Sequence, residues 1–164
     1  MGRDAPPRVR IVGAVPEEAY RGSLEDDGFY TPLIKDHSLE KIRVHNYYVA
    51  LFTTSMKAHW PQRAYLGLYS GPGRARVEST GEIIETTAMS AFRPRFPFTK
   101  YIFVDSDPRC IEALRGRIGA LHEEHDVTLL ESDVTEAVPQ ITTRAPTASR
   151  ASTASLIGPA VLSK

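Results

Sequence analysis

Three groups of residues in the sequence have types and spacings that suit ligand binding. Gly71, Pro72 and Gly73 directly follow an apolar segment, where glycines let the backbone approach a bound molecule closely. Asp105 follows a second apolar segment, and Asp133 lies just beyond a third. A carboxylate at Asp105 can accept hydrogen bonds from both hydroxyls of a ribose, and one at Asp133 can meet an adenine amino group. Together the three groups would suit an adenosyl ligand.

Each group also has a purely structural explanation. Turns use glycine everywhere, so the two glycines alone would indicate only a change of chain direction. Asp105, Asp107 and Asp133 have the residue type that caps helices. Three polar groups after three successive apolar segments are nevertheless more specific than any one of them. We therefore expect cofactor contacts from Tyr69, Ser70, Gly71, Gly73, Asp105 and Asp133.

The spacing around the turn distinguishes between candidate cofactors. A nicotinamide dinucleotide fingerprint needs glycine or alanine three residues after its second glycine, and this sequence has Arg76 there. Its acidic residue should follow after ~20 residues, whereas Asp105 comes 32 residues after Gly73. A nucleoside triphosphate loop is excluded too, because no Gly-Lys-Ser or Gly-Lys-Thr follows the turn. S-adenosylmethionine fits best, since it has no pyrophosphate that requires the full glycine set.

The elements that would position these residues alternate between strands and helices. Apolar runs rich in β-branched and aromatic residues predict strands over 63–69, 101–104 and 127–130. Helical spacing predicts helices over 38–59 and 80–92, with one further helix after each of the two later strands. This alternation predicts an α/β fold with a parallel sheet, in which ligands bind at the carboxyl ends of the strands.

Two helix starts are marked by capping residues. Asp107 as N-cap and Pro108 at the first helical position begin the helix after the second strand. Ser79 and Glu82 have the spacing of a capping box and predict the start of the helix over 80–92.

Composition excludes several classes of protein. The 164 residues suit one domain, and no run approaches the ~18 apolar residues of a membrane span. The chain begins without a secretory signal pattern, so we expect a cytoplasmic protein with no membrane partner. Twenty basic residues balance twenty acidic ones, which argues against a nucleic-acid-coating protein without excluding nucleic acid as a partner in a small basic groove. The single cysteine, Cys110, excludes a disulfide framework.

Other reactive residue types have ordinary explanations. His122 and His125 lack the spacing of a zinc motif, so we expect no metal site. Cys110 lies early in a predicted helix beside its apolar stripe, where a cysteine is typically inert. A basic flank along residues 38–59 is interpreted as a solvated face, the alternative being a groove for a phosphate-bearing acceptor. Its members are Lys41, Arg43, His45, Lys57 and His59.

The two ends of the chain differ from its middle. Prolines and glycines interrupt any period in residues 1–35, which we expect to form a poorly ordered arm apart from Phe29 and Tyr30 docking onto the core. Residues 142–164 are rich in Ala, Ser and Thr and contain no aromatic and no acidic residue. We expect this tail to be disordered, which leaves residues 36–141 as the folded domain.

The ordered series of motifs resembles the first half of the three-Cys-motif partner proteins, a bacterial family with a class I methyltransferase-like fold. The resemblance covers residues 26–141. Its pieces are DGFYTP (27–32), SLEK (38–41), SMK (55–57) with Trp60, YLGLYSGPGR (65–74), YIFVDSDP (101–108) and SDVTE (132–136). The resemblance implies S-adenosylmethionine as cofactor, with its methionine part at the glycine turn, its ribose at Asp105 and its adenine near Asp133. It also implies a three-Cys-motif protein as a partner.

The sequence departs from that family in two places. Gly67 stands where such folds carry an acidic residue that opens the glycine motif. The family fold has seven strands, and we expect here a Rossmann-like sheet truncated after about three. The strand over 63–69 would then be an exposed edge, which is prone to pair with other chains. We hypothesise that the tail after about residue 141 is read in a shifted frame, or that the gene is a remnant.

Three functional hypotheses follow from the sequence. The first is a truncated methyltransferase-like protein that binds S-adenosylmethionine, with no catalytic residue identified and the methyl acceptor left open. The second is a non-catalytic partner module whose sheet is completed by another chain. The third is an inactive gene fragment. Saturable binding of S-adenosylmethionine would separate the first hypothesis from the other two.

Overall fold

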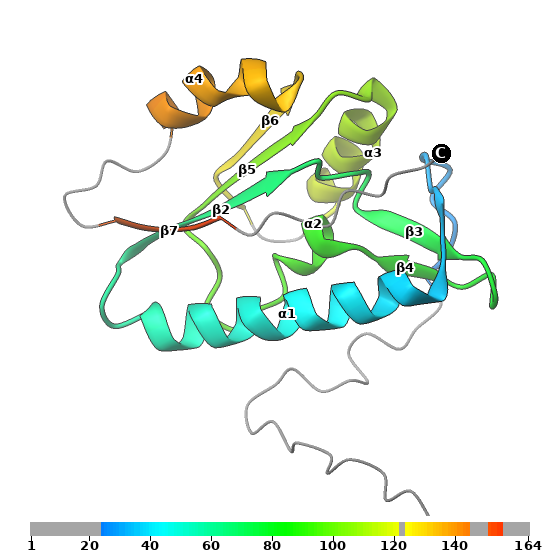
Figure 1. Ribbon diagram of the computed structural model, residues 1–164, viewed down its shortest axis with the longest axis horizontal. Helices are drawn as coiled ribbons and strands as arrows, with labels where there is room; N and C mark the ends of the chain where they lie inside the picture. The colour runs from blue at the N-terminus through cyan, green and yellow to red at the C-terminus, as the bar shows by residue number, and fades with distance from the viewer. Residues whose placement is uncertain (1–23, 122–123, 145–150, 156–164) are drawn as a thin grey trace, which may run out of the picture.

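Four parallel strands form the central sheet of the protein (Figure 1). The structure, a computed structural model, describes residues 24–121, 124–144 and 151–155. The strands lie side by side in the order β6-β5-β2-β7. They are β2 (Gln62–Leu68), β5 (Lys100–Asp105), β6 (Val127–Glu131) and β7 (Ala151–Ser155). The first three confirm the strands predicted from the apolar runs, and the chain is an α/β protein as predicted.

The order of the strands reverses at β2. The chain passes from β2 to its neighbour β5 and on to β6, and then crosses back to place β7 on the other side of β2. Leu68 pairs with Val104, and Asp105 pairs with Glu131, so β2, β5 and β6 end at the same edge of the sheet. In parallel sheets of this topology, ligands bind beyond the carboxyl ends of the strands where the order reverses. The residues that follow Leu68 therefore lie at the place where a ligand is expected.

Helices cover both faces of the sheet (Figure 1). They are α1 (Asp36–Met56), α2 (Thr87–Ser90), α3 (Pro108–Gly119) and α4 (Val134–Arg144). α1 confirms the helix predicted over 38–59. α3 begins as predicted, because the Asp107 carboxylate accepts a hydrogen bond from the Arg109 amide at 2.9 Å and Pro108 stands in the first turn.

The larger core lies on the face covered by α1, α2 and α3. Tyr65 of β2 and Tyr101 and Phe103 of β5 are fully buried there against Val49 of α1 and Leu114 of α3. The aromatic rings contact one another at centroid distances of 5.7 to 6.3 Å. Burial of several aromatic side chains in one cluster provides much of the apolar stabilisation of a small domain.

A smaller core lies on the opposite face, beneath α4. Ile102 and Val104 of β5 pack there with Leu130 of β6 and Ala137 of α4. Successive residues of β5 thus point to opposite, covered faces, which explains why its sequence shows no polar alternation.

A second, three-stranded sheet includes residues from the helix predicted over 80–92. Its strands are β1 (Leu33–Ile34), β3 (Arg74–Val77) and β4 (Ile83–Glu85), in the order β1-β3-β4. The predicted capping box is instead the turn between β3 and β4, where Gly81 has a φ of +73° and the Val77 amide donates to the Glu82 carbonyl. The prediction of a helix over residues 80–86 is therefore wrong, and only the four residues of α2 are helical.

Residues at both predicted tails take part in the fold. β7 pairs in parallel with β2 over five residues, from Gln62 opposite Ala151 to Leu66 opposite Ser155. The sheet in the described residues therefore has four strands instead of about three, and the expectation of an exposed β2 edge is wrong. Backbone pairing needs no aromatic or acidic side chain, so composition gave no sign of this strand. Residues 142–144 belong to the end of α4, and residues 24–35 include β1. The predictions for residues 1–23, 145–150 and 156–164 lie outside the described residues.

His45 lies in the core rather than in the basic flank predicted for α1. It is 8% exposed, and its Nε2 lies 2.8 Å from the Tyr65 hydroxyl. Burial lowers the pKa of His45 below its usual range, although a hydrogen bond with Asn46 acts in the opposite direction.

This depressed pKa predicts a loss of stability in mild acid. Below about pH 6.5 His45 is protonated in the unfolded chain but stays neutral in the folded chain. The free energy of unfolding therefore falls as the pH falls toward the pKa of His45 in the folded state. Between pH 7.5 and pH 5.5 we expect the free energy of unfolding to fall more for wild type than for His45→Gln, whose glutamine does not titrate. Urea unfolding of both proteins at the two pH values measures this difference. An identical pH dependence in the two would contradict the assignment.

Candidate functional site

The chain makes a tight turn directly beyond the carboxyl end of β2, in residues 69–73, which we call the glycine turn. Tyr69 has a φ of 56°, which is rare for a residue with a bulky side chain, and Gly71 and Gly73 have φ of +64° and +86°. The Tyr69 side chain is 52% exposed, so burial of its ring does not compensate for this backbone conformation. Such a strained, exposed residue is typical of functional sites.

Asp105 joins the end of β5 to the glycine turn. Its Oδ2 accepts a hydrogen bond from the Gly71 amide at 2.8 Å, and its Oδ1 accepts one from the Asp107 amide at 3.0 Å. The Ser70 amide donates to the Val104 carbonyl at 3.0 Å. Each carboxylate oxygen can accept more than one hydrogen bond, so Asp105 keeps acceptor capacity for a ligand hydroxyl. The structure thus brings Asp105 together with Ser70 and Gly71, as the sequence predicted.

Buried polar atoms without partners gather around the same turn. Within the described residues, the buried side-chain atoms that have no hydrogen-bond partner are Ser70 Oγ, Arg74 Nε and Thr86 Oγ1 near the turn, and Arg63 Nε at the amino end of β2. Ser70 is in the turn and Arg74 follows it, and the Thr86 amide donates to the Gly73 carbonyl at 2.8 Å. Buried polar groups are nearly always paired, so unpaired ones at one turn indicate a place for a polar ligand or water.

The two glycines of the turn have different roles. A Cβ at Gly71 would meet nothing within 4 Å, whereas one at Gly73 would lie 2.6 Å from Met89 Cγ and 3.0 Å from Leu114 Cδ1. Gly73 is buried and allows the turn to pack closely on α2 and α3. Its missing side chain therefore makes room for the core, while Gly71 leaves open space beside the Asp105 carboxylate.

Asp133 caps its own helix. Its Oδ1 accepts hydrogen bonds from the Thr135 amide at 2.8 Å and from the Thr135 hydroxyl at 2.6 Å. These bonds, the hydroxyl bond above all, hold the pKa of Asp133 below its usual range. Both stay within the first turn of α4, so the structure does not tie Asp133 to the glycine turn as it ties Asp105.

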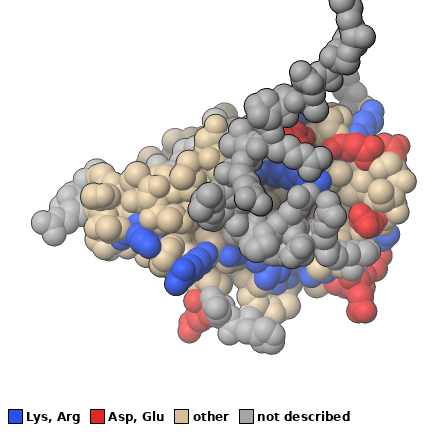
Figure 2. All heavy atoms as spheres, turned by 90° about the horizontal axis from the view of Figure 1, so that it is seen from below, with Lys and Arg blue, Asp and Glu red and all other residues tan. Residues whose placement is uncertain are grey.

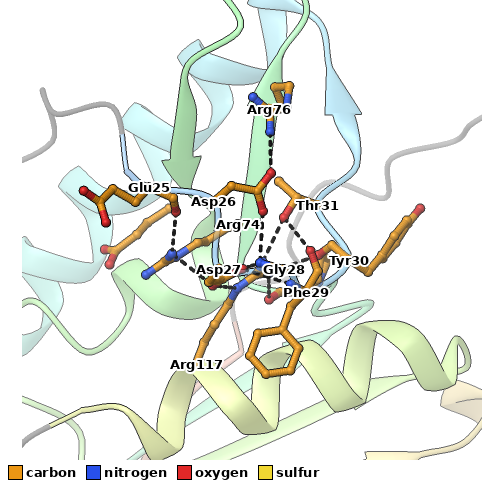
Figure 3. Close-up of polar contacts among 12 residues, drawn as sticks. Glu25, Asp26, Asp27, Gly28, Phe29, Tyr30, Thr31, Arg74, Arg76 and Arg117 are labelled. Carbon is orange, nitrogen blue, oxygen red and sulfur yellow. Dashed lines mark hydrogen bonds and ion pairs between the residues drawn. The ribbon is translucent and has the colours of Figure 1, made fainter.

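A buried arginine beneath the glycine turn was not predicted. The Arg117 side chain in α3 is 1% exposed and pairs with Asp27, whose carboxylate also pairs with Arg74 (Figure 3). The Arg117 guanidinium donates to the Pro72 carbonyl inside the turn at 2.7 Å. Hydrogen bonds from Arg117, and its positive charge, lower the pKa of Asp27 to about 2. The sequence signal was the position of Arg117, three residues after the buried Leu114 on the apolar stripe of α3.

Cys110 lies close enough to Asp105 and Asp107 for their negative charges to act on its thiol, but it is buried. Burial raises the pKa of the Cys110 thiol to about 12, which agrees with the expectation of an inert cysteine. His122 is outside the described residues, and His125 packs against the rings of Phe92 and Tyr101. A hollow of about 410 Å³ between α3 and β6 contains none of the predicted site residues. Its walls are Arg115, Ile118, Gly119, Val127 and Leu129.

Basic side chains lie on the face of the molecule that contains α1. Figure 2 shows Lys and Arg spread along this face, with Asp and Glu gathered toward one end. Lys41, Arg43, Lys57 and His59 are exposed, as expected of a solvated basic flank, and only His45 is buried.

No protein-family model matches the chain, and no curated protein or solved structure matches it significantly. No helix in the described part of the chain is long and apolar enough to cross a membrane.

Proposed function

We propose that the protein binds S-adenosylmethionine at the glycine turn and is a methyltransferase-like protein of the three-Cys-motif partner type. The reversal of strand order at β2 supports a Rossmann-like interpretation of the sheet, because such sheets bind nucleotides beyond the carboxyl ends of their strands at the point of reversal. The family assignment rests on the sequence resemblance, and so does the three-Cys-motif protein as a proposed partner.

One observation carries the proposal: the unpaired Ser70 hydroxyl stands beside Gly71, whose amide is fixed by Asp105. Ser70 is 6% exposed, so its hydroxyl is shielded from bulk water. A ligand with polar groups at the turn would supply the missing partner, and Asp105 would accept from the ribose hydroxyls. The strained backbone of Tyr69 immediately before Ser70 supports the same location.

The chain's own residues would bind and orient the donor. When bound, S-adenosylmethionine supplies a methyl group activated by its positively charged sulfur. Orientation of donor and acceptor is then the main task of the protein. In the proposal the glycine turn holds the methionine part, Asp105 holds the ribose and the edge near Asp133 receives the adenine. We assign no catalytic base.

The hypothesis of a partner module, whose sheet another chain completes, depended on an open edge at β2. β7 pairs with that edge, so this ground no longer supports it. Cofactor binding is the function that the geometry of the glycine turn supports best, and an inactive gene fragment would show no binding in the titration that tests it.

Calorimetric titration of the protein with S-adenosylmethionine tests the proposal. We expect saturable binding at one site, with NADH and ATP in parallel titrations showing none. The preference follows from the turn, which lacks the glycine set that a pyrophosphate requires. Absence of saturable heat with S-adenosylmethionine, or equal binding of NADH, would contradict the proposal.

A further inference from the structure

We propose that Arg117 is a positioning residue for the glycine turn and that Asp27 holds it in place, so that the segment over residues 25–31 forms part of the ligand site. We call this segment the N-terminal strap. The inference deepens the proposed function and rests on it for the identity of the ligand.

Arg117 uses its whole donor capacity to join the strap to the turn (Figure 3). Nε and Nη2 each donate to one carboxylate oxygen of Asp27 at 2.8 Å, and Nη2 also donates to Thr31 Oγ1 at 2.8 Å. Nη1 donates to the Tyr30 carbonyl at 3.2 Å and to the Pro72 carbonyl at 2.7 Å, which makes five hydrogen bonds in all. A guanidinium has five N–H groups, so none is left over. Four of these bonds hold the strap and one holds the turn.

The turn is consequently fixed from two sides. Asp105 of β5 accepts from the Gly71 amide, and Arg117 of α3 donates to the Pro72 carbonyl, so two peptide groups of the turn, separated by one other, are held by opposite charges. Pro72 has no N–H of its own, which leaves its carbonyl as the only backbone hydrogen-bonding group of that residue. Loss of the Arg117 bond would leave the Pro72 carbonyl without this partner, while Asp105 still holds the Gly71 amide and backbone bonds hold Ser70 and Gly73.

The strap lies along α3 as a packed element. The Phe29 ring occupies the space next to Gly116 that a Cβ would need. The Tyr30 ring lies 4.4 Å from the Arg109 guanidinium near the start of α3. The strap therefore extends from beneath the glycine turn toward the end of α3 that adjoins Asp105, which is the edge at which the ligand is proposed to bind.

Arg117→Lys tests the role of the guanidinium, with Arg63→Lys as matched control. Arg63 is also buried and donates to two carbonyls, those of Trp60 and Pro97, but it lies at the amino end of β2. Lysine keeps the charge at either position and cannot reproduce a planar fork of donors. The amide hydrogen exchange of Gly71, measured by NMR relative to amides in the middle of β5, reports the turn without requiring any ligand.

We expect Arg117→Lys to accelerate Gly71 exchange at least tenfold relative to β5 and to weaken S-adenosylmethionine binding at least tenfold. Arg63→Lys should lower the thermal stability to a similar degree and change neither quantity. If the two variants change the relative Gly71 exchange equally, Arg117 is only a structural residue and the inference is overturned.

Asp27→Asn provides a second variant, with Asp26→Asn as its control, in case Arg117→Lys fails to fold. Asp26 lies in the same strap and pairs with Arg76 instead of Arg117. Asp27→Asn should accelerate Gly71 exchange while Asp26→Asn does not, and equal exchange in the two would overturn the inference. If the variants show the expected differences in Gly71 exchange but wild type does not bind S-adenosylmethionine, the proposed function is rejected. The positioning role of Arg117 is then left intact.

Discussion

Replacing Asp105 by alanine is expected to weaken S-adenosylmethionine binding by at least about 100-fold. The substitution removes a carboxylate that would accept from both ribose hydroxyls, and hydrogen bonds to a charged group contribute roughly 1.5–3 kcal/mol each. It also releases the Gly71 amide, which Asp105 Oδ2 holds at 2.8 Å. Both effects act on the same ligand, so calorimetric titration of the variant measures their sum.

Asp107→Ala is the matched control for this prediction. Asp107 lies two residues away and caps α3, with its carboxylate accepting from the Arg109 amide. Its replacement should lower thermal stability through the lost cap and leave the dissociation constant nearly unchanged. Equal weakening of binding by the two variants would show that the effect comes from the start of α3 and not from a ribose contact at Asp105.

Replacing Gly73 by alanine is expected to reduce the free energy of unfolding by about 3 kcal/mol. The left-handed backbone at φ +86° disfavours any residue with a Cβ by roughly 1–2 kcal/mol. The added carbon would also lie 2.6 Å from Met89 Cγ, and overpacking of a core typically costs about 1–3 kcal/mol. Chemical denaturation of the variant measures the total.

Gly71→Ala separates the two contributions. Gly71 has a similar φ of +64°, but a Cβ there meets nothing within 4 Å. We therefore expect a loss of only about 1 kcal/mol, from the backbone alone. Shortening the obstructing side chain in the double variant Gly73→Ala, Met89→Ala should make the effect of the glycine substitution smaller than in wild type. Equal losses for the two single glycine variants would mean that α2 moves aside without cost.

The parts of the fold that follow from burial on both faces could be predicted from the sequence. β5 has an unbroken apolar run because Ile102 and Val104 face one core and Tyr101 and Phe103 face the other. The start of α3 could be predicted because Asp107 and Pro108 specify it locally. These elements predicted that Asp105 and the glycine turn lie at the same edge of the sheet.

The remaining features depend on contacts between distant residues. The Ser79–Glu82 spacing suits a helix cap, but β3 and β4 pair as a hairpin in which Ile84 packs against the core that contains Ala75 and Val77, and tertiary packing overrides the local signal. β7 is specified by the free edge of β2 and not by its own composition. Arg117 gave no sign of its partner, because Asp27 is 90 residues away in the sequence.

The pairing of β2 with β7 also has a consequence for synthesis of the chain. The first strand of the sheet to leave the ribosome receives its second neighbour only when residues 151–155 are made. At ~5–20 residues per second, β2 has one bare edge for several seconds after its own synthesis. Contacts so distant in sequence also slow folding once the chain is complete. The nascent chain is thus most vulnerable to pairing with another copy during this interval, and a co-translational chaperone that shields β2 would improve the yield of folded protein more than one that acts after release.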